Sequence, residues 1–188
     1  MVTNIVIVGV GGQGTLLASR IIGSVVVDAG YDVKVSEVHG MSQRGGSVIT
    51  YVRYGDKVNS PIITEKNADI VLAFEKLEAL RGLDFVKDGG KIIVNTQEIM
   101  PMPVVTGAAK YPEGILETIA EKCDIITADA SKIALEVGNI KAANVVLIGV
   151  LAKNSGIEKE KWIEAIKTNV PAKFLDLNLA AFEKGYSI

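Results

Sequence analysis

Two glycine-rich stretches carry the residues best suited to binding an anion. The first reads Gly9-Val10-Gly11-Gly12-Gln13-Gly14 and matches the pattern G-x-G-x-x-G at its first, third and sixth residues. In that pattern Gly9 makes a tight turn, Gly11 lets backbone approach a phosphate, and Gly14 lets a helix pack closely on a strand. Close packing alone demands the same glycines, so the motif leaves open whether any ligand binds.

The second stretch is a polar segment that surrounds an arginine. Arg44 is flanked by Ser42, Gln43, Gly45 and Gly46. Its planar, permanently charged fork beside flexible backbone suits a phosphate or a carboxylate. The alternative is an arginine that pairs with Glu37 to fix the loop. The candidate ligand contacts are therefore Gly9, Gly11, Gly12, Gln13, Gly14, Ser42, Arg44, Gly45 and Gly46.

Other polar residues give weaker signals. Glu37 lies roughly 20 residues past the glycines, where an acidic residue holds a ribose in dinucleotide-binding folds, but we favour a plain loop carboxylate here. His39 is either a group that titrates near neutral pH or a loop imidazole bonded to backbone. Glu75, Asn95 and Thr96 are candidates only because they end predicted strands. No nucleophile, base and orienting group occur together, so we expect no catalytic residue in this chain.

The composition excludes several functions. Cys123 is the only cysteine and His39 the only histidine, so this chain alone makes no disulfide, iron–sulfur cluster or multi-histidine metal site. We expect Cys123 to be a small buried residue. The net charge of -2, without a basic run, argues against nucleic acid as a partner. No apolar run reaches the roughly 18 residues of a membrane span and no signal peptide is evident, so we expect a soluble, cytoplasmic protein.

The elements that must position these residues form one α/β domain spanning residues 1–188. The apolar run at 5–8 predicts a strand, and the glycines after it predict a turn. The spacing of the apolar residues that follow predicts a helix ending at Gly30. A second strand is expected at 32–35, followed by a long loop over 36–46 beside the glycine turn. Alternation over 48–54, with a turn at 55–56 before 57–58, predicts an antiparallel hairpin strand.

The rest of the chain alternates strands and helices before it becomes helical. We expect strands at 68–74, 91–95 and 124–128, helices at 76–83, 112–122 and 129–137, a turn at 88–90, and an extended crossing held by Pro101 and Pro103. A helix over 142–152 is apolar nearly all round and should be buried on several sides. Amphipathic helices follow at 158–169 and 172–184. The fold class is therefore three-layer α/β/α, with a mostly parallel, Rossmann-like sheet, an antiparallel hairpin and C-terminal helices.

Three parts of the sequence together resemble a known family. They are the glycine turn, the run Glu37-Val38-His39-Gly40-Met41-Ser42-Gln43-Arg44-Gly45-Gly46-Ser47-Val48, and the strand end Val52-Arg53. The pattern is similar to the gamma-type subunit or domain of 2-oxoacid:ferredoxin oxidoreductases, over essentially the full chain. The run from Glu37 to Gly46 points to the indolepyruvate, or aryl-pyruvate, branch.

The resemblance implies a non-redox subunit, which we expect to be inactive alone. In this family a larger subunit holds thiamine diphosphate and iron–sulfur clusters, oxidatively decarboxylates the 2-oxoacid, and reduces ferredoxin with formation of an acyl-coenzyme A. The gamma-type part is associated with access of coenzyme A, and the sequence leaves open whether the glycine turn binds coenzyme A or stays empty. Two alternatives stay open: a free-standing nucleotide- or flavin-binding module, and a purely structural assembly subunit.

Overall fold

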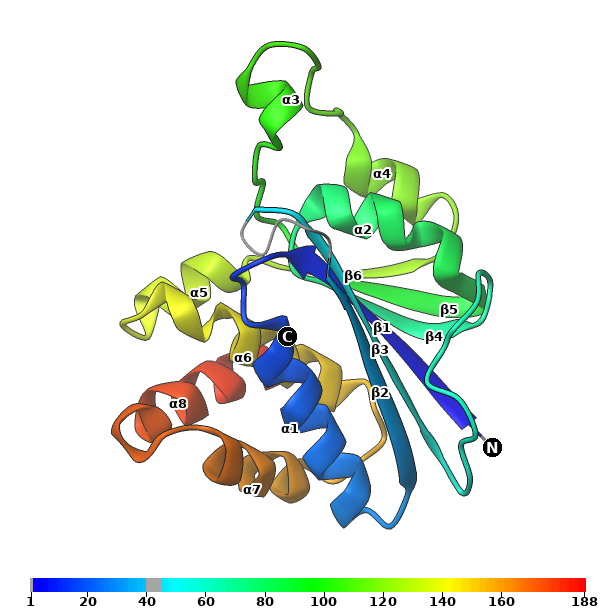
Figure 1. Cartoon of the computed structure of the whole chain (residues 1–188). Helices are drawn as coiled ribbons and strands as arrows, with labels where there is room; N and C mark the ends of the chain where they lie inside the picture. The colour runs from blue at the N-terminus through cyan, green and yellow to red at the C-terminus, as the bar shows by residue number, and fades with distance from the viewer. Residues whose placement is uncertain (1, 40–44) are drawn as a thin grey trace.

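The computed structural model describes residues 2–39 and 45–188 and has a six-stranded sheet at its centre (Figure 1). The strands lie in the order β2-β3-β1-β4-β5-β6. Only β3 is antiparallel to its neighbours β1 and β2, while β1, β4, β5 and β6 pair in parallel. Their bounds are β1 Val2–Val10, β2 Asp32–His39, β3 Ser47–Gly55, β4 Ala68–Ala73, β5 Val86–Asn95 and β6 Asp124–Ala128.

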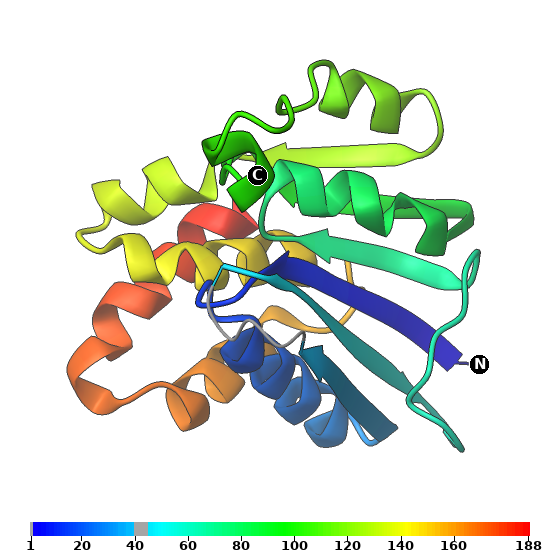
Figure 2. The same ribbon diagram turned by 45° about the horizontal axis from the view of Figure 1, so that its top comes forward.

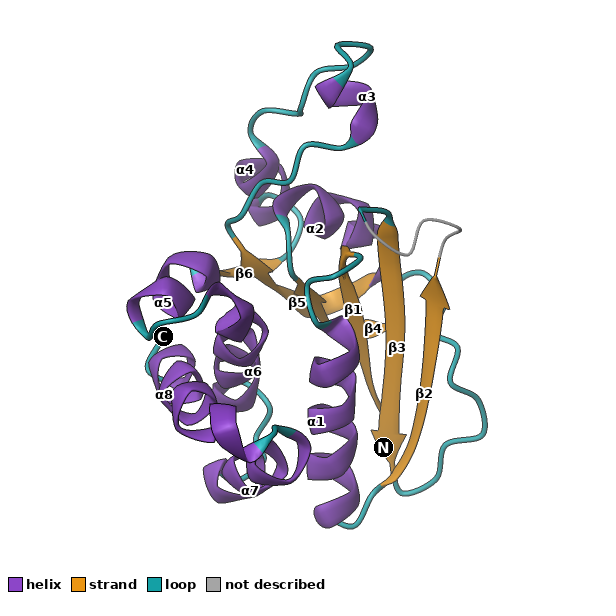
Figure 3. Cartoon of the chain, turned by 60° about the vertical axis from the view of Figure 1, so that its left-hand side comes forward, coloured by secondary structure: helices purple, strands orange, loops and turns teal. Residues whose placement is uncertain are grey.

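Helices cover both faces of the sheet, which confirms the predicted three-layer architecture (Figures 1 and 2). One face is covered by α1 (Thr15–Asp28), α5 (Ala130–Glu136), α6 (Ala143–Lys153), α7 (Lys159–Asn169) and α8 (Leu175–Tyr186), and the other by α2 (Lys76–Gly82) and α4 (Ile115–Ala120). The short helix α3 (Met102–Val105) stands away from the sheet (Figure 3). Single 3-10 turns occupy Leu83–Phe85, Ile140–Ala142 and Ala172–Phe174.

The larger of the two apolar cores lies between the sheet and the helices α1, α5, α6, α7 and α8, and α6 lies at the centre of this core. Nine of the eleven residues of α6 are buried, as its uniformly apolar sequence predicts. It packs against α8 through Gly149 and Gly185, where an added Cβ on either glycine would overlap backbone of the opposite helix. No helix among the described residues is long and apolar enough to cross a bilayer.

Two predictions around β3 need correction. Residues 36–39 were expected to be loop but continue β2, where Ser36 to Val38 pair with Tyr51 to Ile49. Polar side chains are tolerated there because β2 is an edge strand. The partner expected for β3, residues 57–58, is not a strand; β3 pairs with β2 and β1 instead. Val58 is buried, and its N–H donates to the Asp32 carboxylate.

Two predictions beyond β4 also need correction. The expected turn at residues 88–90 lies inside β5, where the register with β4 shifts between Ala68 and Ile70. The extended crossing is correct at Pro101 but wrong at Pro103, which falls in the first turn of α3. A proline is tolerated there because the N–H groups of the first helical turn have no intrahelical partner.

Candidate functional site

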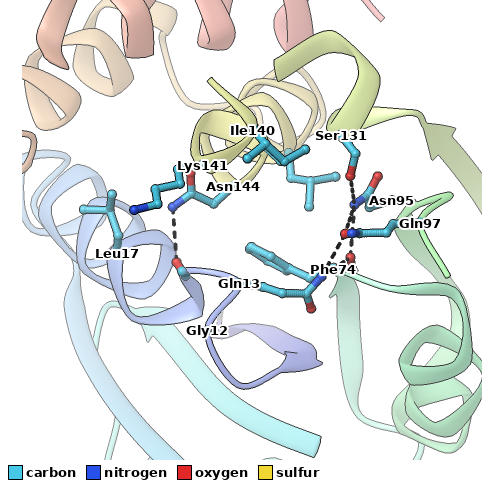
Figure 4. Close-up of a pocket in the computed structure, with 13 residues that line it drawn as sticks. Gly12, Gln13, Leu17, Phe74, Asn95, Gln97, Ser131, Ile140, Lys141 and Asn144 are labelled. Atoms are coloured by element: carbon cyan, nitrogen blue, oxygen red, sulfur yellow. Dashed lines mark hydrogen bonds between the residues drawn. The ribbon is translucent and has the colours of Figure 1, made fainter. Parts of the chain in front are cut away.

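A cavity of about 520 Å³ opens at the carboxyl edge of the sheet, between the turn after β1, the end of β5, and helices α5 and α6 (Figure 4). In parallel α/β sheets this edge is the usual place for a ligand. The cavity is lined by Gly12, Gln13, Gly14, Leu17, Phe74, Asn95, Gln97, Ser131, Ile140, Lys141, Ala143, Asn144 and Leu147. Three of the predicted contacts, Gly12, Gln13 and Gly14, therefore lie on its wall.

The glycines of the turn have different tasks from those predicted. Gly9 is the close-packing residue, because a Cβ there would lie 3.1 Å from Phe74 Cβ. Gly14 is the N-cap of α1 with a φ of +86°, and a Cβ on it would lie 2.5 Å from Asn144 Nδ2. The third glycine of the motif thus supplies a left-handed cap and room for a side chain from α6.

The backbone of Gly11 is used within the protein. Its N–H donates to the Gly46 carbonyl at 2.9 Å, and its carbonyl accepts from the Gly45 N–H at 3.4 Å. The structure therefore brings the end of the second stretch beside the glycine turn, as expected, but it leaves no Gly11 N–H for a phosphate. Ser42 and Arg44 lie outside the described residues, and their ligand contacts stay predictions.

A network of side-chain amides joins the glycine turn to the ends of β4 and β5. The Gln13 amide oxygen accepts from the Val10 N–H at 2.7 Å, and its nitrogen donates to the Phe74 carbonyl at 3.0 Å and to Gln97 Oε1 at 3.2 Å. The buried Asn95 donates to the same carbonyl, to Gln97 Oε1 and to Ser131 Oγ, and accepts from an α5 N–H. These contacts fix the floor of the cavity (Figure 4).

The opposite wall favours a negative charge. The first intrahelical bond of α1 runs from the Ala18 N–H to the Gly14 carbonyl, and no side chain caps the helix, so its first N–H groups have no intrahelical partner. Lys141 extends towards Leu17 at the mouth (Figure 4). Of the described residues on the wall it is the only charged one, and it takes part in none of the ion pairs within the described part of the chain. The wall therefore combines a cation with the positive end of a helix dipole.

Sequence patterns missed several residues of the cavity. Asn95 was a candidate by position, and Gln97, two residues on, carried the same signal because it also follows β5. Lys141 and Asn144 gave no local signal: the Asn144 amide donates to the carbonyl of Gly14, 130 residues earlier, at 3.4 Å. They reach the site only because α6 packs beside α1.

The remaining candidates are not among the described residues that line the cavity. Glu37 is on the edge strand β2, where it accepts from the Thr50 hydroxyl at 3.5 Å, and it does not line the cavity. His39 ends the same strand, opposite Val48. The Thr96 N–H donates to the Ala128 carbonyl. Cys123 is partly buried, and burial, with the neighbouring Asp124 charge, raises its thiol pKa, so it stays protonated at neutral pH. Neither Glu37 nor Cys123 is placed to act on a ligand of the cavity.

Sequence comparison relates the whole chain to one family. The model of the pyruvate ferredoxin/flavodoxin oxidoreductase family matches residues 4–188. A relative from Pyrococcus horikoshii, named indolepyruvate oxidoreductase subunit IorB, is 46% identical over 188 residues, covering 97% of this chain and 93% of that protein. Identity at this level over the full length shows that the two chains share one fold and one ancestor.

Structural comparison gives the same fold. The gamma subunit of a keto/oxoacid ferredoxin oxidoreductase from Geobacter sulfurreducens superposes with a TM-score of 0.74 at 23% identity, covering 98% of this chain and 96% of that one. The 2-oxoglutarate:ferredoxin oxidoreductase from Magnetococcus marinus, solved with 2-oxoglutarate, coenzyme A and succinyl-CoA bound, gives 0.76 at 20% identity, covering 99% of this chain but 30% of that longer one. The chain therefore belongs to the pyruvate ferredoxin/flavodoxin oxidoreductase family.

Proposed function

We propose that this chain is the non-redox subunit of a cytoplasmic indolepyruvate:ferredoxin oxidoreductase. The observation that carries the proposal is the 46% identity, over nearly the full length of both chains, to a subunit of an indolepyruvate oxidoreductase. The composition agrees with this role, because one cysteine cannot hold an iron–sulfur cluster. We therefore assign the clusters to a larger partner subunit, to which the family resemblance also assigns thiamine diphosphate and the contact with ferredoxin.

The reaction of the assembled complex balances without an oxidant other than ferredoxin. The bond between the carboxyl and keto carbons of the aryl-2-oxoacid breaks and releases carbon dioxide. A thioester bond forms between the keto carbon and the sulfur of coenzyme A. The electron pair reduces ferredoxin, and one proton is released; iron–sulfur clusters on the partner subunit would carry the electrons. None of these steps needs a side chain of this subunit, whose contribution is to bind and orient.

We further propose that the cavity holds the phosphate-bearing nucleotide part of coenzyme A. That group is an anion joined to a flat, largely apolar base, and the cavity offers both kinds of surface. Lys141 and the first turn of α1 suit the phosphates, while Leu17, Phe74 and Ile140 form apolar wall. Among the described residues that line the cavity, none is acidic, so none opposes an anion. The sequence predicted that Gly11 approaches the phosphate. We propose instead that the phosphate lies at the first turn of α1, which follows the glycine turn.

Binding to the purified chain tests the ligand proposal. Coenzyme A and adenosine 3′,5′-bisphosphate are titrated by calorimetry into wild type, Lys141→Ala and the control Lys184→Ala, which removes an exposed lysine of α8 outside the cavity. A charge-assisted contact is worth about 1.5–3 kcal/mol, so Lys141→Ala should bind at least about tenfold more weakly, and Lys184→Ala as wild type does. Equal affinities of all three proteins would contradict the proposal, and so would a bound flavin that makes the purified chain yellow.

A further inference from the structure

The segment that joins β5 to α4, residues 98–114, forms an arm that projects from the sheet at its carboxyl edge (Figures 1 and 3). The arm begins one residue after Gln97, which lines the cavity. The short helix α3 near its tip has no buried residue. The arm therefore adds almost nothing to the core and stands beside the proposed ligand site.

The base of the arm is held by one buried carboxylate. Glu75, which is 1% exposed, follows β4 and accepts the Glu78 N–H at 2.9 Å, thereby capping α2. Its other oxygen accepts the Ile99 N–H at 3.0 Å, at the start of the arm, and the Tyr111 hydroxyl near its end. Burial, with the hydrogen bond to Glu75 and its charge, raises the pKa of Tyr111, which keeps the hydroxyl protonated to donate. Both ends of the arm are thus tied to the sheet.

The tip of the arm exposes apolar side chains and no charge. Met102 is 70% and Val105 67% exposed, and Met100 is also exposed. Residues 99–109 contain no charged side chain, in a chain that is 22% charged. The nearest charges flank this run at Glu98, which pairs with Lys76, and at Lys110. Enrichment in methionine and depletion of charge are typical of the buried centre of a protein interface.

We propose that the arm is the element by which this chain docks onto the larger subunit of its complex, with Met102 and Val105 inserted into an uncharged apolar groove of that subunit. The inference rests on the proposed function. Under that proposal the reacting groups belong to the partner, so coenzyme A in the cavity must reach chemistry there and the partner must approach the carboxyl edge. The arm is the apolar projection at that edge, and its uncharged run enters a groove without burying an unpaired charge.

Comparison with relatives also points to a separate subunit as the occupant. In the Magnetococcus marinus protein the same fold makes up 30% of one longer chain, so its neighbouring parts are joined to it covalently. The Pyrococcus horikoshii relative is instead named a subunit, and the match covers 93% of its length, so a protein of that kind must hold its partner through its surface. A projection with a fixed base loses little conformational freedom on docking, which strengthens a noncovalent contact.

The test measures the affinity of this chain for the purified larger subunit. The variants are Met102→Lys and Val105→Lys, with Val27→Lys as the control, because Val27 is 55% exposed at the far end of α1. Each arm variant should bind about tenfold or more weakly, since a buried anchor typically accounts for at least that factor, while the control stays within about threefold of wild type. Melting temperatures and coenzyme A affinity of the isolated variants should match those of wild type.

Each other outcome counts against the docking role. Arm variants that bind the larger subunit as wild type does would overturn it, and so would a control that weakens binding equally. A concentration-dependent dimer of the isolated chain that Val105→Lys dissolves, with unchanged binding to the larger subunit, would assign the arm to self-association instead. If the wild-type chain does not bind the larger subunit at all, the proposed function fails and this inference fails with it.

Discussion

The two glutamines of the amide network, Gln13 and Gln97, should respond in opposite ways when each is replaced by glutamate. Gln13 donates its amide hydrogens to two acceptors, the Phe74 carbonyl and Gln97 Oε1. Gln97 uses its side-chain oxygen as an acceptor from Gln13 and Asn95, and its amide nitrogen makes no hydrogen bond with described residues. Gln13→Glu removes donors that the network uses, whereas Gln97→Glu removes a donor that it does not use.

The expected loss for Gln13→Glu follows from the two hydrogen bonds. Each is worth about 0.5–1.5 kcal/mol net, so the free energy of unfolding should fall by about 1–3 kcal/mol at pH 7. The new carboxylate also faces two acceptors, which raises its folded-state pKa above the unfolded value of about 4.3. A group with a raised carboxyl pKa destabilises the fold only above the unfolded pKa, so the deficit should shrink as pH falls towards about 4.

Gln97→Glu is the matched control. Its carboxylate still accepts from Gln13 and Asn95, now in charge-assisted bonds, so stability at pH 7 should equal or exceed that of wild type by up to about 1 kcal/mol. Urea denaturation of the three proteins at pH 7 and at about pH 5 measures the differences. Equal losses in both variants, or a larger loss in Gln97→Glu, would refute the amide orientations on which the site description rests. Both variants place a negative charge at the cavity and should weaken coenzyme A binding, which separates stability from ligand affinity.

Two further predictions concern the helix contact and the base of the arm. Gly185→Ala should lower the free energy of unfolding by about 3 kcal/mol, because the added methyl overlaps the Val146 backbone. Gly23→Ala should raise it by about 0.5–1 kcal/mol, because a Cβ there meets no atom within 4 Å. Thermal melts compare the two variants, and equal effects would contradict the close contact of α6 and α8. Burial and Glu75 raise the folded-state pKa of Tyr111, so above the usual tyrosine pKa of about 10 the unfolded state ionises first and the free energy of unfolding falls as pH rises. The stability advantage of wild type over Tyr111→Phe should therefore shrink between about pH 9 and pH 11, and a constant difference in urea denaturation across that range would contradict the Glu75 contact.

Much of the fold could be predicted because its core elements are strongly periodic. The strand at 124–128 was predicted with its observed bounds, and the buried helix at 142–152 is α6 shifted by one residue. Errors occurred where tertiary pairing overrides local composition. Residues 36–39 are polar enough for a loop, yet they complete an edge strand because β3 offers them hydrogen-bond partners.

The candidate site was predictable only where it follows strand ends. The glycine turn and Asn95 sit at the carboxyl edge, so topology alone brings them together. The Gly11 N–H was predicted to be available to a phosphate, but it donates to the Gly46 carbonyl instead, and no motif encodes that hydrogen bond. Lys141, the cation of the cavity, arrives on a 3-10 turn before α6, and its place depends on packing across the whole chain.

The most direct test of the proposed function is reconstitution of activity. The larger subunit is coexpressed with and without this chain, and reduction of ferredoxin is followed with indolepyruvate, with pyruvate and with 2-oxoglutarate as alternative substrates, each in the presence of coenzyme A. The proposal predicts ferredoxin reduction that requires this chain, requires coenzyme A, and proceeds faster with indolepyruvate than with the other two oxoacids. Full activity of the larger subunit alone, or no stable complex between the two chains, would contradict it.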